Sequence, residues 1–276
     1  MIQRGLFFLW LCLSTATAFS QGWIPVGARA NSMANAVVAD VDAWSFFHNP
    51  GALGYMENAA VGASYENRYL LKELQTQAIV YVQPLKAGVL SVGAQSYGYR
   101  VYRSNRFGVG YALKLHEKIA MGVQLNYQDV WVQNYDYIGT LTAEFGILAK
   151  INKKISLGFS VMNLNHAHAT RIPNQRFGTF LRLGLQYQIS KLVAINAEVE
   201  KEIRSKIRPR LGVDYQVVNQ FFLRIGAAYN PPEITFGFGY GFDFGLRIDA
   251  GSAWRQHLGW SPNIGLTYDF KAKEKK

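Results

Sequence analysis

The charged side chains that could do chemistry in this chain of 276 residues stand at every second position of alternating polar and apolar segments. Alternate side chains of a β-strand point to the same side, so these residues would face a common interior. Arginines gathered there would attract a carboxylate or another anion, or they would pair with neighbouring carboxylates. We favour internal pairing, because a polar interior needs its charges matched in any case. The residues concerned are Glu144, Arg182, Arg210, Asp214, Arg224, Arg247 and Asp249.

A second basic group falls in segments that we expect to be loops at one end of the strands. Each guanidinium presents a fork of donors that suits phosphate oxygens, and lipopolysaccharide phosphates are the simplest ligand for such a group. An anionic partner protein is the alternative. The group contains Arg100, Arg103, Arg106, Arg171, Arg176, Arg204, Lys206, Arg208 and Arg255.

Two further patterns could indicate a metal or a nucleotide, and both are weak. His166 and His168 would point to the same side if their strand continued, but no third ligand lies near them, so we expect no metal site. Gly237, Gly239 and Gly241 resemble a nucleotide-binding loop only superficially. They alternate with aromatic residues inside a strand and open no helix, so small side chains facing a crowded interior explain them better.

An enzyme that modifies membrane lipids is a separate hypothesis. It would need a histidine next to a serine, held by an orienting group. His257 is the one loop histidine near serines, here Ser252 and Ser261, and nothing beyond proximity supports it. We therefore predict that the protein is not an enzyme and uses no cofactor.

The first twenty residues predict export. Residues 1–20 contain Arg4, an apolar run and then small residues, which is typical of a secretory signal peptide. The single cysteine, Cys12, lies inside this segment, so the exported chain would have no disulfide. Lys and Arg number 29 against 18 Asp and Glu, yet export argues against a nucleic-acid partner.

Composition and periodicity define the fold class. Hydrophobic residues make up 49% of the chain, which excludes disorder, and beyond residue 20 no apolar run is long enough for a membrane helix. Alternation from residue 58 onward predicts fourteen strands. They cover 58–69, 74–84, 88–99, 106–115, 119–130, 139–151, 155–165, 176–189, 192–200, 208–218, 221–229, 234–243, 246–254 and 262–270.

Short connections alternate with longer ones between these strands, and Tyr and Trp residues fall near the strand ends. Both features are typical of outer-membrane barrels, whose closure pairs every backbone group away from water. We therefore predict an all-β fold, a transmembrane up-and-down antiparallel barrel over residues 58–270, integral to a bacterial outer membrane. Residues 271–276 would form a basic periplasmic tail.

Residues 21–57 lack strand periodicity. The segment 28–42 is rich in helix formers and small residues, which predicts a short helix. The whole segment would be an ordinary soluble cap, or a hatch that plugs the barrel.

This segment also resembles the N-terminal signature of the FadL-like outer-membrane barrels, most nearly the PorV/PorQ group of Bacteroidetes. The matching positions include Gly27, Ala28, Arg29, Asp40, Trp44, Asn49 and Pro50. The resemblance implies a hatch followed by a fourteen-strand barrel. It also implies one of two roles: passing small hydrophobic molecules, often sideways into the membrane, or serving type IX secretion as a carrier or attachment partner for secreted proteins.

The lumen would distinguish the two roles. A transporter predicts a continuous apolar pocket or a lateral gap between strands, for which 237–241 is the candidate kink. A carrier predicts a plugged barrel with an exposed apolar patch at its outer mouth.

Overall fold

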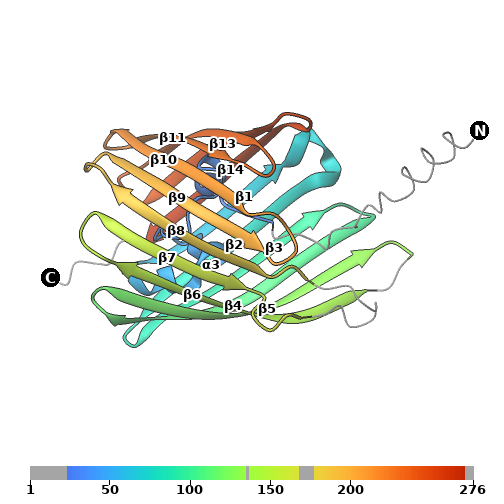
Figure 1. Ribbon diagram of the computed structural model, residues 1–276, viewed down its shortest axis with the longest axis horizontal. Helices are drawn as coiled ribbons and strands as arrows, with labels where there is room; N and C mark the ends of the chain where they lie inside the picture. Colours follow the sequence, from blue (N-terminus) through green and yellow to red (C-terminus); the bar gives the residue numbers. More distant parts are fainter. Residues whose placement is uncertain (1–23, 135–136, 168–176, 271–276) are drawn as a thin grey trace, which may run out of the picture.

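The computed structural model describes residues 24–134, 137–167 and 177–270, and its strands close into one antiparallel barrel (Figure 1). Each strand pairs with the next along the chain, and β1 pairs with β14, which confirms the predicted fold class. The strands are β1 (Ala59–Asn67), β2 (Gln75–Leu85), β3 (Gly88–Gly98), β4 (Tyr102–His116), β5 (Ile119–Val132), β6 (Ile138–Lys150), β7 (Ile155–Met162), β8 (Phe180–Gln188), β9 (Val193–Glu202), β10 (Arg208–Val218), β11 (Phe221–Ala228), β12 (Glu233–Gly241), β13 (Leu246–Arg255) and β14 (Gly259–Phe270). The predicted signal peptide and the 271–276 tail lie outside the described residues.

The two ends of the barrel differ in their connections. At one end, which we call the turn end, tight turns join β2 to β3, β4 to β5 and so on around the barrel. At the other, the loop end, four of the seven connections are longer than any connection at the turn end, and the longest joins β7 to β8. The loop end also carries two short 3-10 helices, η2 (Arg68–Leu70) and η3 (Lys72–Leu74).

Strand boundaries differ from the prediction mainly at the loop end. β4 begins at Tyr102 rather than at residue 106, because Gly98 has a φ of 109°, which a glycine adopts easily and which allows a tight hairpin. There the Tyr99 amide donates to the Tyr102 carbonyl at 2.7 Å. β7 ends at Met162 rather than at residue 165, because Asn163 has a φ of 56° and turns the chain out of the strand.

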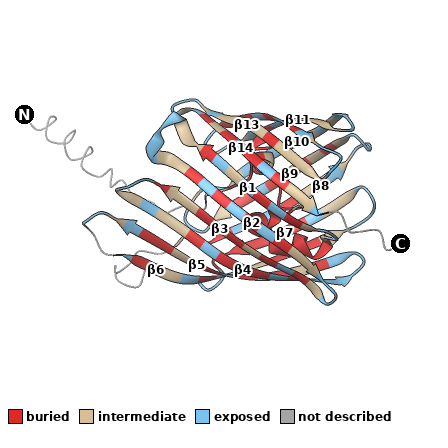
Figure 2. Ribbon diagram, turned by 180° about the vertical axis from the view of Figure 1, so that it is seen from behind, coloured by how far each residue is buried: buried red, intermediate tan, exposed pale blue. Residues whose placement is uncertain are grey.

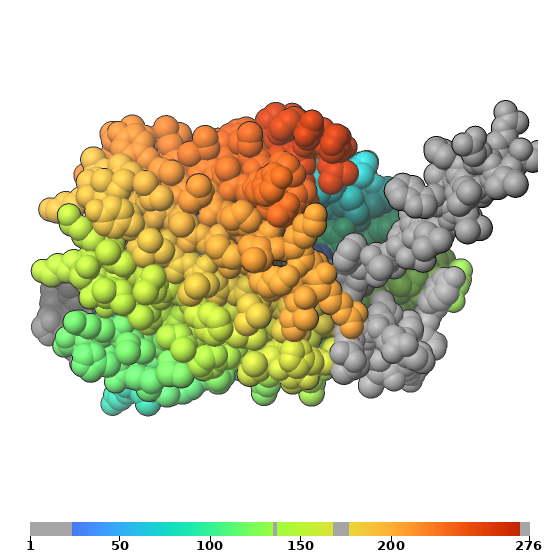
Figure 3. Space-filling view, in the orientation of Figure 1, coloured from blue at the N-terminus to red at the C-terminus, as the bar shows by residue number. Residues whose placement is uncertain are grey.

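The outer face of the wall is strongly apolar. Buried and exposed residues alternate along each strand, as Figure 2 shows, and the outward positions carry large side chains. Examples are Ile79, Phe107, Leu125, Leu183 and Phe236, which are all at least half exposed. The space-filling view of Figure 3 shows the segments from yellow to red, toward the C-terminal end of the chain, side by side on one face of the barrel. Exposed apolar surface of this extent is expected of a barrel that faces lipid.

Residues 24–57, which we call the hatch, fill the interior of the barrel. The hatch contains α2 (Ala28–Ser32), α3 (Ser45–His48) and the 3-10 helix η1 (Pro50–Tyr55). Helix α2 is shorter than the predicted 28–42 helix, because Ala34 and Asn35 have φ values of 51° and 60° that end it. Among the described residues, no helix is long and apolar enough to cross a bilayer.

Inward-facing glycines make room for the hatch backbone. A Cβ on Gly158 would overlap the Val38 carbonyl oxygen, and one on Gly146 would overlap the Asn49 amide oxygen. Gly237 likewise faces the Ser32 hydroxyl, whereas a Cβ on Gly241 would meet nothing closer than 3.9 Å. The glycines of β12 therefore serve packing, and not all of them contact the hatch.

Candidate functional site

An arginine–carboxylate network holds the hatch against β8, β9 and β10. Arg182 is fully buried, and its Nε lies 2.6 Å from Glu198 Oε1. Arg210 lies 2.6 Å from Glu200 and 3.5 Å from Glu198. The same guanidinium groups reach the hatch, since Arg182 Nη2 donates to the Asn35 carbonyl at 2.8 Å. Glu198 also accepts from the hatch amides of residues 37 and 38.

A second network crosses from the hatch to β10, β11 and β13. Its hatch member is Arg29, which lies 2.7 Å from Asp40, 2.9 Å from Asp42 and 3.2 Å from Asp214. Arg224 joins Asp214 at 3.0 Å to Asp249 at 2.6 Å, and Arg247 lies 3.1 Å from Asp249.

All the predicted interior residues therefore point into the lumen. Six of them belong to these two networks, and the seventh, Glu144, lies 2.7 Å from Arg106. Every lumen arginine that the structure describes is matched by a carboxylate, which is the internal pairing that we favoured.

His48 connects the first network to the start of the hatch. Its Nε2 lies 2.9 Å from the Val26 carbonyl, so Nε2 carries the proton and Nδ1 accepts from Arg182 at 3.3 Å. Burial, reinforced by the Arg182 charge, lowers the pKa of His48 well below its usual range. Burial shifts the pKa of Asp40 in the opposite direction. It raises this pKa to about 6, although the charge of Arg29 opposes the shift.

These two shifts predict a pH response of hatch docking. A depressed histidine pKa contributes docking stability above about pH 6.5 that is lost as pH falls, by up to ~1.4 kcal/mol per pH unit. The raised pKa of Asp40 stabilises docking at low pH, an effect lost as pH rises through about 6, so the two oppose each other. In Asp40→Asn, we expect docking to weaken steadily from pH 7 to pH 5.

The measurement uses the absence of cysteine after residue 20. Ala39 is buried in the hatch, so Ala39→Cys reports hatch opening through its rate of reaction with a disulfide reagent that works across this pH range. Adding His48→Gln to Asp40→Asn should make the reaction rate of Ala39→Cys nearly independent of pH. A rate that is already independent of pH in Asp40→Asn alone would contradict the role given to His48.

Apolar contacts hold the opposite side of the hatch. Phe46 and Phe47 are fully buried, lie edge to face with centroids 4.8 Å apart, and pack with Val80, Val82 and Val89 of β2 and β3. The hatch thus presents a charged side to β8–β13 and an apolar side to β1–β4.

The hatch residues that match the N-terminal signature described above also have structural roles. Gly27 has a φ of 99° at the start of α2, and a Cβ there would lie 3.1 Å from the Trp44 ring. Ala28 packs against Gly265, and the Trp44 indole donates to Thr267 at 3.0 Å. The Asn49 amide donates to the carbonyls of Val38 and Ile147, next to Pro50 at the start of η1.

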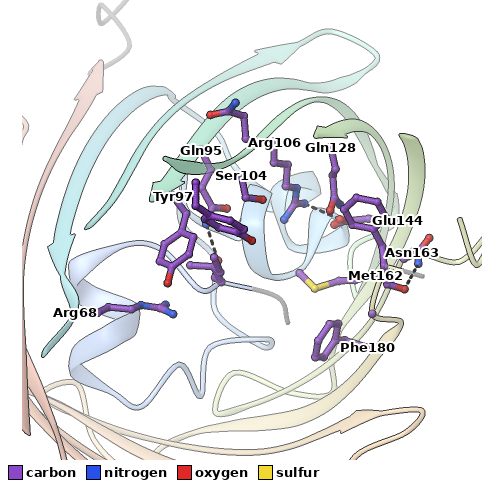
Figure 4. Close-up of a pocket in the computed structure, with 15 residues that line it drawn as sticks. Arg68, Gln95, Tyr97, Ser104, Arg106, Gln128, Glu144, Met162, Asn163 and Phe180 are labelled. Carbon is purple, nitrogen blue, oxygen red and sulfur yellow. Dashed lines mark hydrogen bonds and ion pairs between the residues drawn. The ribbon is translucent and has the colours of Figure 1, made fainter. Parts of the chain in front are cut away.

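A pocket of about 330 Å³ opens above the hatch at the loop end (Figure 4). Arg106 lies at the pocket with its guanidinium carbon 5.6 Å from the centre of the Phe47 ring. The walls of the pocket consist of aromatic, thioether, amide and charged side chains. Lining residues that sequence reasoning missed include Arg68, Gln95, Tyr97, Tyr102, Gln128, Met162 and Phe180.

The predicted outer basic group is corrected in part. Arg106 is buried, because it has the inward parity of β4 that Gly108 and Ala112 share, so it belongs to the lumen. Arg208 lies 3.1 Å from Glu233, which also binds Arg255. Exposed members are Arg100, Arg103, Arg204 and Lys206, and the predicted members Arg171 and Arg176 lie outside the described residues.

The weaker candidates gain no support from the structure. His166 Nδ1 lies 3.1 Å from the Thr179 hydroxyl, and His168 lies outside the described residues. Within the described ranges, no group of three His, Cys, Asp or Glu residues could hold a metal. The two serines considered as partners of His257 have other neighbours. The Ser261 hydroxyl accepts a hydrogen bond from the Tyr69 amide, and Ser252 lies opposite Pro262 in the β13–β14 ladder.

The β6–β7 seam is where the wall is interrupted. Its ladder runs from Lys150–Ser156 only as far as Phe145–Val161. Beyond it, the Asn165 side chain replaces a strand: its oxygen accepts from the Ala143 amide at 3.0 Å and its nitrogen donates to the Leu141 carbonyl at 2.9 Å. Leu141 is 65% exposed and Leu164 is 52% exposed beside this seam.

The predicted kink at 237–241 is wrong. β12 is paired with β13 from Ile234–Trp254 through Gly241–Arg247, and with β11 as far as Tyr240–Phe221. A glycine in a strand lacks a side chain but keeps its backbone donor and acceptor, so it leaves no gap in the ladder. The lining of the mouth pocket instead includes residues from both sides of the β6–β7 seam, namely Glu144 of β6 and Met162 and Asn163 at the end of β7.

Comparison with solved structures places this architecture in a group of barrels. The chain shares its fold with the toluene transporter TbuX of Ralstonia pickettii, with a TM-score of 0.71 and 11% identity over 90% of this chain and 98% of that one. The toluene transporter TodX of Pseudomonas putida gives 0.67 and 12% over 92% and 99%. A FadL homologue of Pseudomonas aeruginosa gives 0.63 and 13% over 91% and 100%.

Sequence comparison adds no closer assignment. No protein-family model matches the chain, and no curated protein matches it. At these identities the structural likeness shows a shared fold, the closed fourteen-strand antiparallel barrel, and nothing finer.

Proposed function

We propose that this protein is an integral outer-membrane barrel that passes small, largely hydrophobic molecules from its mouth pocket through the β6–β7 seam. The observation that carries the proposal is that the lining of an amphipathic pocket includes residues of both strands at the point where their ladder ends. Three barrels of the same fold are described as toluene transporters or as a FadL homologue, which supports the same function.

The pocket suits a small ligand with an apolar body. Its volume of about 330 Å³ lies at the lower end of the roughly 300–1,000 Å³ typical of ligand sites. Tyr97, Tyr102, Met162 and Phe180 offer flat or adaptable apolar surface, and Gln95 and Gln128 offer hydrogen bonds. A monocyclic aromatic molecule with at most one polar group fits this lining.

A lateral exit suits the hatch as well. The hatch fills the lumen and is fixed by two buried ion networks, so a straight path through it would require those networks to break. Among the described residues, the side-chain amide of Asn165 and the backbone amide of Leu164 supply the hydrogen bonds across the seam at the level of Ala143. Opening there would break a few hydrogen bonds and expose the pocket to lipid.

A reversible disulfide bond across the seam, which we call the seam staple, tests this route. Leu164 donates a backbone hydrogen bond to Ala143, so Ala143→Cys with Leu164→Cys would place two thiols on either side of the seam in a chain that otherwise lacks cysteine after residue 20. We expect oxidation to reduce uptake of labelled toluene by cells about tenfold, corresponding to ~1.4 kcal/mol, and reduction to restore it.

The matched control is Phe236→Cys with Ser252→Cys, which joins two outward residues already paired between β12 and β13. Oxidation of the control should leave uptake unchanged. If the seam staple forms and uptake persists, the molecule leaves by another route and the proposal fails.

We further propose an orientation in which the loop end faces outward and the turn end faces the periplasm. The exposed Arg100, Arg103 and Arg204 would then lie at the level of lipopolysaccharide phosphates, which their guanidinium groups suit.

A second candidate is a type IX secretion accessory barrel of the PorV/PorQ kind. The observation in its favour is a row of exposed apolar side chains on consecutive loops along one half of the loop-end rim. They are Leu70, Leu71, Ile203, Ile207, Tyr229 and Leu258. Such a surface on a plugged barrel would bind a secreted protein, and under this alternative the seam staple would leave function unchanged.

A further inference from the structure

Arginine and lysine occupy different places in this protein. Every ion pair within the described ranges uses arginine and none uses lysine. Seven of the ten described lysines instead lie at the turn end, where the nearby carboxylates are Glu57, Glu117, Asp243 and Asp269, and the other three, Lys72, Lys201 and Lys206, lie at the loop end. The turn-end lysines are Lys86, Lys114, Lys118, Lys150, Lys153, Lys154 and Lys191.

Two of these lysines point inward rather than toward lipid. Lys114 has the parity of Ala112, and Lys150 has the parity of Leu148, which are both buried against the hatch. Their Nζ atoms lie 5.5 Å and 3.9 Å from the centre of the Tyr55 ring, at the end of η1. The two ammonium groups therefore flank one aromatic ring of the hatch.

The surroundings leave these charges available to a ligand. The Tyr55 hydroxyl donates to the Glu117 carbonyl at 3.3 Å, so the ring is fixed at the base of the hatch. Glu57 is the carboxylate whose charge acts on Lys150, but it is exposed and forms no ion pair with it within 4 Å. Cation–π contact with one ring compensates two ammonium groups only in part.

We propose that Lys114, Lys150 and Tyr55 form the centre of a docking site for an acidic peptide segment of a soluble protein on the turn-end side. Side chains that face the lumen opening cannot reach lipid headgroups around the barrel, so an anionic membrane does not explain them. A segment of several carboxylates matches the charge, because lysines of three neighbouring turns, at 86, 118 and 153–154, surround the central pair.

This inference goes beyond the proposed function, because the site lies at the opposite end of the barrel from the mouth pocket. It gives the hatch a contact surface for a soluble partner, separate from the route of the molecule through the seam.

The test uses the exported protein in nanodiscs of uncharged phosphatidylcholine and a fluorescent peptide of consecutive glutamates as the probe. We expect saturable binding at low salt that weakens as salt rises, because screening reduces the attraction. Lys114→Gln with Lys150→Gln should raise the dissociation constant at least about tenfold, and Tyr55→Leu should raise it less.

The matched control is Lys153→Gln with Lys154→Gln, which removes the same charge from an exposed turn, and it should have a clearly smaller effect. Three results would overturn the proposal: no binding of the peptide, equal loss in both double variants, or binding only to vesicles that contain phosphatidylglycerol. Toluene uptake by the Lys114→Gln, Lys150→Gln variant should match wild type. Failure of the docking-site proposal is therefore distinguishable from failure of the proposed route through the seam.

Discussion

Removal of residues 21–57 should turn a closed barrel into an open pore. The intact protein should release no carboxyfluorescein from liposomes and show no stepwise current in planar bilayers, because the hatch fills the lumen. The deletion should release the dye completely and conduct, since the lumen of the fourteen-strand barrel is lined by polar residues once the hatch is gone.

A deletion could prevent folding, so a point substitution provides the second measurement. Leucine at Gly158 cannot coexist with the Val38 backbone, so Gly158→Leu should displace the hatch and open the same pore in a full-length chain. Gly241→Leu is the control, because a side chain there meets no hatch atom. If Gly158→Leu folds and stays closed, the hatch does not plug the lumen by contact with this wall.

Arg182→Ala should release the hatch more strongly than any other single substitution in the charged networks. It removes the nearer of the two arginine partners of Glu198, and it removes two hydrogen bonds to the hatch carbonyls of Asn35 and His48. Removing one partner of a buried ion pair typically costs ~3–5 kcal/mol. The reaction rate of Ala39→Cys should therefore rise on the order of a hundredfold or more.

Arg247→Ala is the matched control for this substitution. Arg247 also pairs with a lumen carboxylate, Asp249, but its side chain is 23% exposed and it contacts no hatch residue in the networks described above. Its loss should change the Ala39→Cys rate only a few-fold. Equal effects of the two substitutions would mean that the buried position of Arg182 does not determine hatch docking.

The alternation of residue types carried most of the prediction of the barrel, and it failed where side chains take over from the backbone ladder. Polar residues near the start of β4 were assigned to a loop, although the Ser96 hydroxyl and the Asn105 and Asp129 side chains form a hydrogen-bonded row across β3, β4 and β5. Arg106 was misplaced for the same reason, since β4 begins at Tyr102 rather than at residue 106 and Arg106 faces the lumen from within the strand.

The mouth pocket shows the second limit. Its lining comes from β3, β4, β5, β6, the end of β7 and the start of β8, and no short motif joins these residues in sequence. The one sequence signal for Gln95, Ser104 and Gln128 is that each stands at an inward-facing position of its strand. That position alone does not distinguish a residue of the pocket wall from a residue that contacts the hatch.

The sequence by itself determined that strands with one apolar face must close on themselves, because unpaired strand edges and exposed apolar rows are unstable except in a closed barrel facing lipid. It also determined that the inward arginines need carboxylates. Only the tertiary structure decided that the hatch lies inside, that its charged side meets Arg182 while its apolar side meets β2, and that the ladder fails at Asn165 rather than at Gly237. These are contacts between residues far apart in the chain, and their energies depend on the geometry that closure creates.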